Sequence, residues 1–277
     1  MLGFQFTKWF WSLWDHLLTI VLWNLMYLSA GGLFFFLLRA LTIKESFLST
    51  VHPALSGIAL CILLFLSTIL QHACALSNYS IAKFESSKWK DSLRRAFRKD
   101  SLLAALLLDF GIALLSLIFF FGWHFYSRKG DLLSLTALGL LFWMALLILL
   151  SFGFYFPILV REKFSVPKAL RQSLLVCLDN LPLSLILGLT SCVLFLMSFL
   201  PPLMLFFGPM GLGLWYEVSI HILYYKYQYL ETLSQEKSGT AKNKRRKVNI
   251  PWFNLLVEER ERIGPRTLSN FIFPWKD

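Results

Sequence analysis

The feature of this sequence that most constrains its fold is a series of apolar runs, each about 20 residues long and separated by polar connections. As a helix, a run of that length crosses the hydrocarbon core of a membrane, which is about 30 Å thick. Hydrophobic residues make up 57% of the 277 positions and the mean hydropathy is +0.61. One soluble core of this size needs fewer apolar residues. We therefore predict an all-α, polytopic membrane protein.

Six runs are long enough to be crossings. Pro201 and Pro202 are predicted to form the tight turn between the last two, because neither residue continues a helix. The N-terminal segment, 1–16, contains several Trp residues, which favour the headgroup level, so it is predicted to lie along the membrane interface. The six crossings are predicted at 17–38, 54–77, 102–121, 132–157, 181–200 and 203–225.

Lys and Arg residues indicate how the chain is threaded. Seven of them fall in 83–99 and four in 161–171, whereas the other connections between runs hold two, two and none. Cytoplasmic loops carry the excess of Lys and Arg, so both basic segments and both termini are predicted to be cytoplasmic, in a cell membrane. The net charge of +11 then reflects membrane orientation, and we expect no nucleic-acid partner.

The two basic segments are related in sequence. Residues 79–94 align without a gap to 156–171, and each segment follows one apolar run and leads into the next. This pattern predicts a membrane helix, a cytoplasmic amphipathic basic helix and a second membrane helix, used twice as a parallel internal repeat. Chance similarity of two membrane-exit segments is the alternative. The identical pairs are Ile81 and Ile158, Glu85 and Glu162, Leu93 and Leu170, and Arg94 and Arg171.

Five polar residues within the runs form a predicted intramembrane polar cluster: Gln71, His72, Asp109, Glu217 and His221. Ionisable groups are costly in a membrane and normally face the interior of a helix bundle. With the predicted threading, Asp109 and Glu217 lie about 12 to 14 Å inside the cytoplasmic boundary. One interpretation is a proton or cation pathway. The other is a hydrogen-bonded staple between helices, in which Asp109 pairs with His72, His221 or an arginine.

The chain changes character after the sixth run. Residues 231–249 are predicted to be a basic, flexible linker and 250–277 a cytoplasmic tail. Within the tail, 251–263 is predicted to be a short helix that Gly264 and Pro265 end, and the aromatic segment 270–277 is predicted to dock on the bundle or on a partner. The linker cations either attract anionic lipid headgroups, by about 1 kcal/mol each, or are merely solvated. They are Lys242, Lys244, Arg245, Arg246 and Lys247.

Sequence signatures of catalysis are lacking. There is no glycine-rich phosphate loop, no nucleophile elbow and no paired-cysteine metal motif. The four cysteines fall in or beside apolar runs and are interpreted as small packing residues. We expect no enzymatic activity, no cofactor and no metal. The cysteines are Cys61, Cys74, Cys177 and Cys192.

Several short motifs resemble those of the YesL family of bacterial integral membrane proteins. They are Phe97-Arg98-Lys99, the stretch Tyr-Phe-Pro-Ile-Leu-Val-Arg at 155–161 followed by Leu170, and Asp-Asn-Leu-Pro at 179–182; Asn24 and the exit at 226–230 also fit. The resemblance covers roughly 14–230. The chain lacks the Pro and Gly residues expected after the first crossing, and its tail extends beyond the family core. The resemblance implies a six-helix protein of unknown activity, often associated with carbohydrate uptake, and it supplies no catalytic residues.

Two functions fit these observations. The first is a non-enzymatic accessory or scaffold protein that assembles with a membrane partner such as a transport system. The second is a small transporter or channel with a polar pathway at Asp109, Glu217 and His221. Many transporters are built from inverted repeats, whereas the predicted repeat is parallel, so we favour the first.

Overall fold

The computed structural model describes residues 1–42, 53–86, 88–129, 131–162, 165–237 and 249–266. The described residues form helices and no strand, which agrees with the all-α prediction. The linker cations at 242–247 and the aromatic segment at 270–277 lie outside the described residues.

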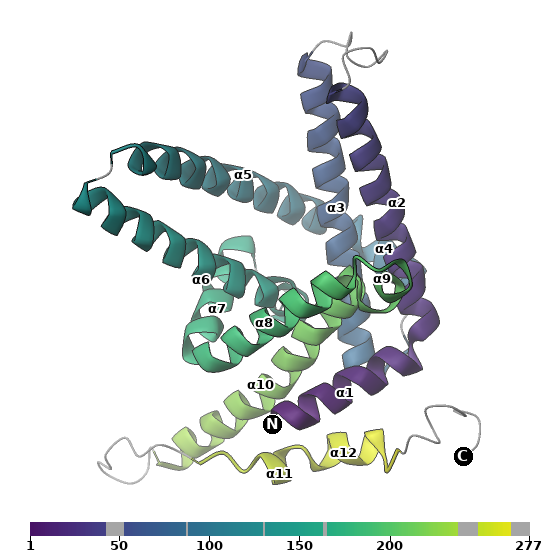
Figure 1. Ribbon diagram of the computed structural model, residues 1–277. Coiled ribbons are helices and arrows are strands. Elements are labelled where there is room, and N and C mark those ends of the chain that lie inside the picture. The colour runs from purple at the N-terminus through teal and green to yellow at the C-terminus, as the bar shows by residue number, and fades with distance from the viewer. Residues whose placement is uncertain (43–52, 87, 130, 163–164, 238–248, 267–277) are drawn as a thin grey trace.

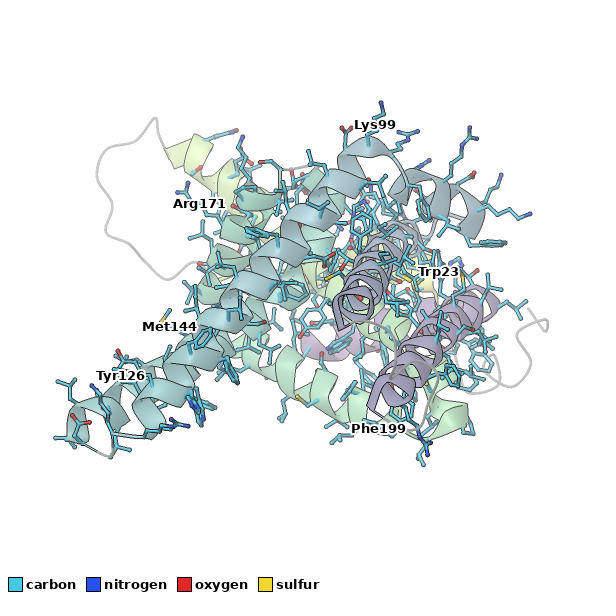
Figure 2. All side chains as sticks on the ribbon, turned by 90° about the horizontal axis from the view of Figure 1, so that it is seen from above. Trp23, Lys99, Tyr126, Met144, Arg171 and Phe199 are labelled. Carbon is cyan, nitrogen blue, oxygen red and sulfur yellow. The ribbon has the colours of Figure 1, made fainter. Side chains whose placement is uncertain are left out.

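Four long helices pair into two hairpins. The first joins α2 (Leu17–Thr42) to α3 (Pro53–Ala82), and the second joins α5 (Lys99–Ser127) to α6 (Leu132–Glu162). The hairpins diverge from a common base, so their tips lie apart (Figure 1). Seen from above, Tyr126 lies at the tip of the second hairpin, which projects away from the other helices (Figure 2).

The hairpin surfaces are suited to lipid. Helices α5 and α6 both reach a mean hydropathy of 2.5 and are largely uncovered by other parts of the chain. Large side chains such as Phe110 on α5 and Leu149 on α6 are 68% and 69% exposed. A soluble protein rarely exposes contiguous apolar surface of this extent. Four described helices are long and apolar enough to cross a membrane, or up to six if each of two bent pairs counts as one span.

A short helix follows each of α3 and α6. They are α4 (Trp89–Ala96) and α7 (Val166–Asp179), and their first residues differ by the same offset as the two related sequence segments. On α7, Val166, Ala169 and Ser173 are buried at helical spacing while the intervening residues are largely exposed. The chain turns by 103° between α7 and α8 (Leu181–Met197), which is the second bent pair.

The predicted turn at the two prolines is wrong in detail. Pro201 and Pro202 are the first two residues of a short helix, α9 (Pro201–Phe207), so the turn after α8 lies just before them. Proline suits a first helical turn because the missing N–H would have no partner there. The predicted sixth crossing is also interrupted, since Gly208 separates α9 from α10 (Pro209–Lys237).

Helix α10 forms the centre of the fold. Four of its residues, Met210, Leu214, Val218 and Ile222, recur at intervals of four and are completely buried. They belong to a hydrophobic core that includes residues of α1 (Leu2–Asp15), α2, α3, α6 and α8. Among the four single candidate spans, the one that contains α10 has the lowest mean hydropathy, and the largest share of it is buried by the rest of the chain.

The two ends of the described chain meet beside α10. Helix α1 turns by 84° into α2 and packs against α10. The short helices α11 (Trp252–Leu255) and α12 (Val257–Ile263) lie below α1 in Figure 1, at the end of the molecule opposite the tip of the α2–α3 hairpin. Leu256 is completely buried in the core formed with α1 and α10. The short helix predicted at 251–263 is therefore present, broken at Leu256, and it ends at Gly264, which adopts a φ of +70°.

Candidate functional site

The candidate site is a buried network of charged side chains that begins on α10. Glu217 is completely buried, and its Oε1 accepts a hydrogen bond from Nη2 of Arg161 at 2.9 Å. Arg161 lies in the last turn of α6, with its guanidinium 5.2 Å from the ring centre of Tyr79 and 5.4 Å from that of Tyr224. A carboxylate removed from water needs such a partner, and the two rings stabilise the cation by cation–π attraction.

One turn further along α10, His221 extends the network. Its Nδ1 lies 3.3 Å from Nη2 of Arg161, and its Nε2 lies 2.9 Å from Oε1 of Glu259 on α12. A guanidinium can only donate, so Nδ1 is the acceptor and the Nε2–H donates to Glu259. These bonds assign a neutral imidazole with one defined tautomer. His221 thus connects the end of α6 to the tail.

Glu259 is the point at which the tail joins the network. Its carboxylate accepts hydrogen bonds from His221, from the hydroxyl of Tyr225 at 2.9 Å and from Nζ of Lys8 on α1. Lys8 is completely buried and also lies 4.9 Å from the ring centre of Phe84. We call these residues the ionic network, and they are Lys8, Arg161, Glu217, His221, Tyr225 and Glu259.

The charges within the ionic network are balanced. Burial raises the pKa of the Glu259 carboxyl, but the hydrogen bond from His221 and the positive charge of Lys8 lower it further, to about 2. Burial lowers the pKa of Lys8 to about 8, against the opposing attraction of Glu259. Near neutral pH the Lys8–Glu259 pair is therefore ionised. With Arg161 and Glu217 it gives two cations and two carboxylates around a neutral histidine.

A cavity of about 230 Å³ borders the network between α3, α6, α8 and α10. The second oxygen of Glu217, Oε2, and Oδ1 of Asn78 are buried without a hydrogen-bond partner among the described residues, and both residues line this cavity. Gln71 and Tyr216 also contribute to its wall. The arrangement offers two acceptor oxygens to a small group that can donate hydrogen bonds.

The predicted intramembrane polar cluster divides between separate groups. Glu217 and His221 both join the ionic network, but Asp109 on α5 accepts a hydrogen bond from Thr68 Oγ1 of α3 at 2.6 Å. Its predicted partners, His72, His221 or an arginine, were wrong, because a hydroxyl from the neighbouring helix takes that place.

The two remaining members of the predicted cluster have surroundings of their own. Gln71 accepts a hydrogen bond from Tyr27 at 3.1 Å. His72 lines a cavity of only about 10 Å³ together with Thr68 and Tyr155.

Four members of the ionic network were not predicted as site residues: Lys8, Arg161, Tyr225 and Glu259. Two of them carry a signal in the sequence. Lys8 is the only charged residue among the first 14, which are rich in aromatic residues, and Arg161 directly follows a charge-free run of 29 residues, 132–160. A single charge in such a context usually has a specific buried partner.

The described residues contain no group of three or more His, Cys, Asp or Glu side chains that could hold a metal ion. The four cysteines are free, and Cys74 and Cys177 are buried. Comparison with models of protein families, with curated proteins and with solved structures found no match to this chain.

Proposed function

We propose that the chain is a non-enzymatic integral protein of a bacterial cell membrane, which acts as an accessory or scaffold for another membrane protein. In this proposal α2, α3, α5, α6, α8 and the α9–α10 segment are six crossings. Helices α4 and α7 lie at the cytoplasmic surface as equivalent parts of a parallel repeat, and both termini are cytoplasmic. The distribution of Lys and Arg and the lengths of the apolar helices support this arrangement.

The observation that carries the proposal is that the polar residues of the candidate pathway serve to join helices. Glu217 binds Arg161 of α6, Asp109 binds Thr68 of α3, and His221 uses both ring nitrogens. A proton or cation pathway needs groups that exchange partners along a continuous route. Side chains that bind each other across helices instead hold a bundle in one arrangement.

The docked tail supports a scaffold function more specifically. Through Glu259, α12 ties α1, α10 and the end of α6 into one assembly, which places the ends of the described chain together on one surface. We propose that this surface binds the partner. The resemblance to the YesL family extends the proposal to a partner that belongs to a carbohydrate uptake system. Contact of the linker cations at 242–247 with anionic headgroups stays a prediction.

The proposal is tested by affinity purification of the full chain from membranes in a mild detergent, followed by mass spectrometry. We expect one membrane protein to co-purify with the wild type and with Asp109→Asn. We expect its loss with Glu259→Ala, which releases the tail from the network. Co-purification that is equal for all three proteins would contradict the role of the docked surface.

A small transporter or channel is the second candidate, because the 230 Å³ cavity presents the unpaired oxygens of Glu217 and Asn78. The two candidates differ in proton flux across liposomes that contain the chain and a pH-sensitive dye. The scaffold proposal predicts flux equal to that of empty liposomes. Flux above that level, lost in both Asp109→Asn and Glu217→Gln, would favour the transporter and contradict the scaffold.

A further inference from the structure

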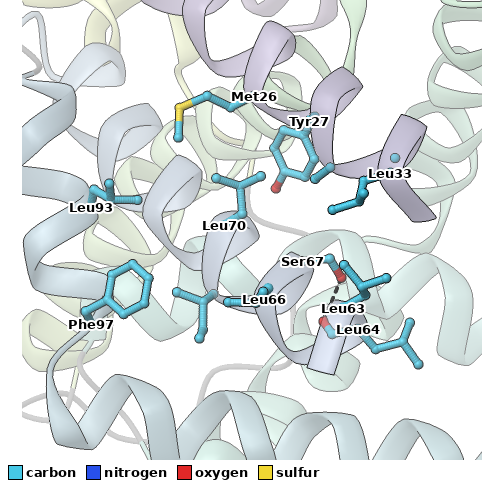
Figure 3. A pocket seen from close by; sticks show the side chains of 13 residues that line it. Met26, Tyr27, Leu33, Leu63, Leu64, Leu66, Ser67, Leu70, Leu93 and Phe97 are labelled. Carbon is cyan, nitrogen blue, oxygen red and sulfur yellow. Dashed lines mark hydrogen bonds between the residues drawn. The ribbon is translucent and has the colours of Figure 1, made fainter. Parts of the chain in front are cut away.

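A larger cavity lies between α2 and α3 and is lined by none of the residues of the ionic network. It measures about 540 Å³ and its walls are almost entirely apolar. Leu33 of α2 and Leu64 of α3 are 51% and 53% exposed at its edge, so the cavity opens at the side of the helix pair. We call it the α2–α3 pocket. Its lining, drawn in Figure 3, includes Met26, Tyr27, Leu66, Leu70, Leu93 and Phe97.

The interior of the α2–α3 pocket offers nothing to a polar ligand. Among the described residues that line it, two carry hydroxyl groups and both are already used, because Tyr27 donates to Gln71 and Ser67 donates to the backbone carbonyl of Leu64 at 2.7 Å. A polar molecule would lose its bonds to water there without replacement. A hydrocarbon chain would instead gain contacts with the leucines that line the pocket.

One end of the pocket is closed by the basic helix α4. Leu93 and Phe97 project from α4 and its C-cap toward α2 and α3 (Figure 3). Lys90, Leu93, Arg94 and Phe97 follow the spacing i, i+3, i+4 and i+7, so the two cations belong to the same stripe as the two pocket residues. Arg95, by contrast, falls on another face of the helix.

The cations of this stripe are available to an anion. Lys90 and Arg94 are exposed, and neither forms an ion pair within the part of the chain that the structure describes. Nζ of Lys90 lies 5.5 Å from the ring centre of Trp89, a residue type that favours the headgroup level of a membrane. An apolar pocket and two unpaired cations therefore adjoin on one side of the molecule.

We propose that the α2–α3 pocket binds one acyl chain of an anionic phospholipid, whose phosphate is held by Lys90 and Arg94. The inference rests on the proposed membrane location, and it adds a specific lipid site to the fold. The site suits a ligand with two parts, because the pocket accommodates a hydrocarbon chain and the cations of α4 attract the negative charge beside that chain.

The test is native mass spectrometry of the full chain in detergent, titrated with phosphatidylglycerol or with phosphatidylcholine that has the same acyl chains. We expect the wild type to bind one phosphatidylglycerol in preference to phosphatidylcholine. Arg94→Gln should reduce that preference about fivefold, since one cation near a membrane surface is worth about 1 kcal/mol toward an anionic lipid. Arg95→Gln, a matched loss of one charge on another face, should leave the preference unchanged.

A second variant tests the pocket itself. An added Cβ at Gly31 meets no atom within 4 Å, so Gly31→Leu should fill the pocket without disturbing the helices. It should weaken the binding of both lipids. Gly139→Leu on α6, where the surrounding space is equally open, should weaken neither.

Equal lipid preference in the Arg94 and Arg95 variants, or unchanged binding in Gly31→Leu, would overturn the proposed lipid site. Extraction of the chain from membrane fractions by alkaline carbonate would instead contradict the membrane location. The two failures can therefore be distinguished.

Discussion

The ionic network is a local concentration of buried charge that only its pairing makes tolerable. Lys8 and Glu259 are 0% and 2% exposed, so each has lost nearly all contact with water. The attraction between two buried charges roughly offsets the cost of dehydrating them, whereas an unpaired buried charge is strongly destabilising. The main effect of the pair is therefore to fix how α12 docks on α1, and its net contribution to the free energy of unfolding is small.

Removing one partner of this pair should be costly. Lys8→Met leaves Glu259 buried without its cation, and we expect the free energy of unfolding to fall by roughly 3 to 5 kcal/mol. The measurement is unfolding in mixed detergent micelles, followed by circular dichroism. Arg266→Gln is the control, because the Arg266–Asp15 pair is partly exposed and its loss should cost about 1 kcal/mol or less. Equal losses in both variants would contradict the burial of the pair.

Docking of the tail should depend on acid pH. The pKa of Glu259 is about 2 in the folded chain, against an ordinary value of 4.5. The ionised carboxylate of Glu259 therefore contributes fully to docking of the tail when the pH is above about 4.5, and this contribution is lost as the pH falls from there through about 2. We expect pepsin to release the tail faster in the wild type as the pH falls from 4.5 to 2, relative to Glu259→Gln at each pH. A ratio that stays constant across this interval would contradict the ion pair.

The sequence predicted individual polar residues better than their partners. Glu217 and His221 were identified because an ionisable group in an apolar run is a local signal. Glu217 and its partner Arg161 are 56 positions apart in the sequence, and His221 and its partner Glu259 are 38 positions apart. A local sequence pattern does not predict contacts over such separations. The partner of Asp109 was equally hard to predict. It is Thr68, a neutral residue, and the apolar runs contain several other Ser and Thr residues that could have bound the carboxylate.

The hydrogen bond between Thr68 and Asp109 joins α3 to α5. Asp109→Asn keeps an acceptor oxygen for the Thr68 hydroxyl, so we expect little change in melting temperature. Asp109→Leu removes the bond between the two helices and leaves the Thr68 hydroxyl only the carbonyl of Leu64 on its own helix, at 3.2 Å. This change should cost about 0.6 to 2 kcal/mol, the range for interhelical hydrogen bonds in membranes. The measurement is thermal unfolding in detergent. Equal loss of stability in both variants would show that the charge, rather than the hydrogen bond, joins the helices.

At the scale of whole elements, Asn24 of α2 explains how α9 and α10 are joined. Its Oδ1 accepts a hydrogen bond from the N–H of Met210 at 3.0 Å, and its Nδ2 donates to the carbonyl of Leu205 at 2.9 Å. The side chain thereby satisfies backbone groups on both sides of the break at Gly208. Hydropathy locates helices of this length because it is a local property. It did not locate this break, which depends on a residue about 180 positions away.

Gly208 should be required for the close approach of α2 to this break. A Cβ at this position would lie 2.5 Å from the backbone carbonyl of Met204 and 2.8 Å from Oδ1 of Asn24. We expect Gly208→Ala to destabilise the fold by about 1 to 3 kcal/mol, as overpacking of a dense interior does. Gly139→Ala on α6, where a Cβ meets no atom within 4 Å, should not destabilise it. Detergent unfolding of both variants measures the difference, and equal stability would contradict the tight packing.

At the scale of the molecule, a covered central helix carries two largely uncovered hairpins. The polar groups lie where α10 meets α1, α6 and α12, whereas the hairpin surfaces expose apolar side chains such as Phe110 and Leu149. This distribution fits a protein whose hairpins contact lipid and whose ordered polar contacts lie at the base. The central requirement of the proposed function is therefore that the α5–α6 hairpin crosses the membrane with its tip on the outer side.

The most direct test of that claim is the accessibility of epitope tags in intact cells. One tag is inserted after Arg128, at the tip of the α5–α6 hairpin, and another follows Asp277. We predict that antibody labels the Arg128 tag in intact cells and the Asp277 tag only after the membrane is made permeable. A tag at Arg128 that stays protected until permeabilisation would contradict the proposed threading, and with it the membrane scaffold.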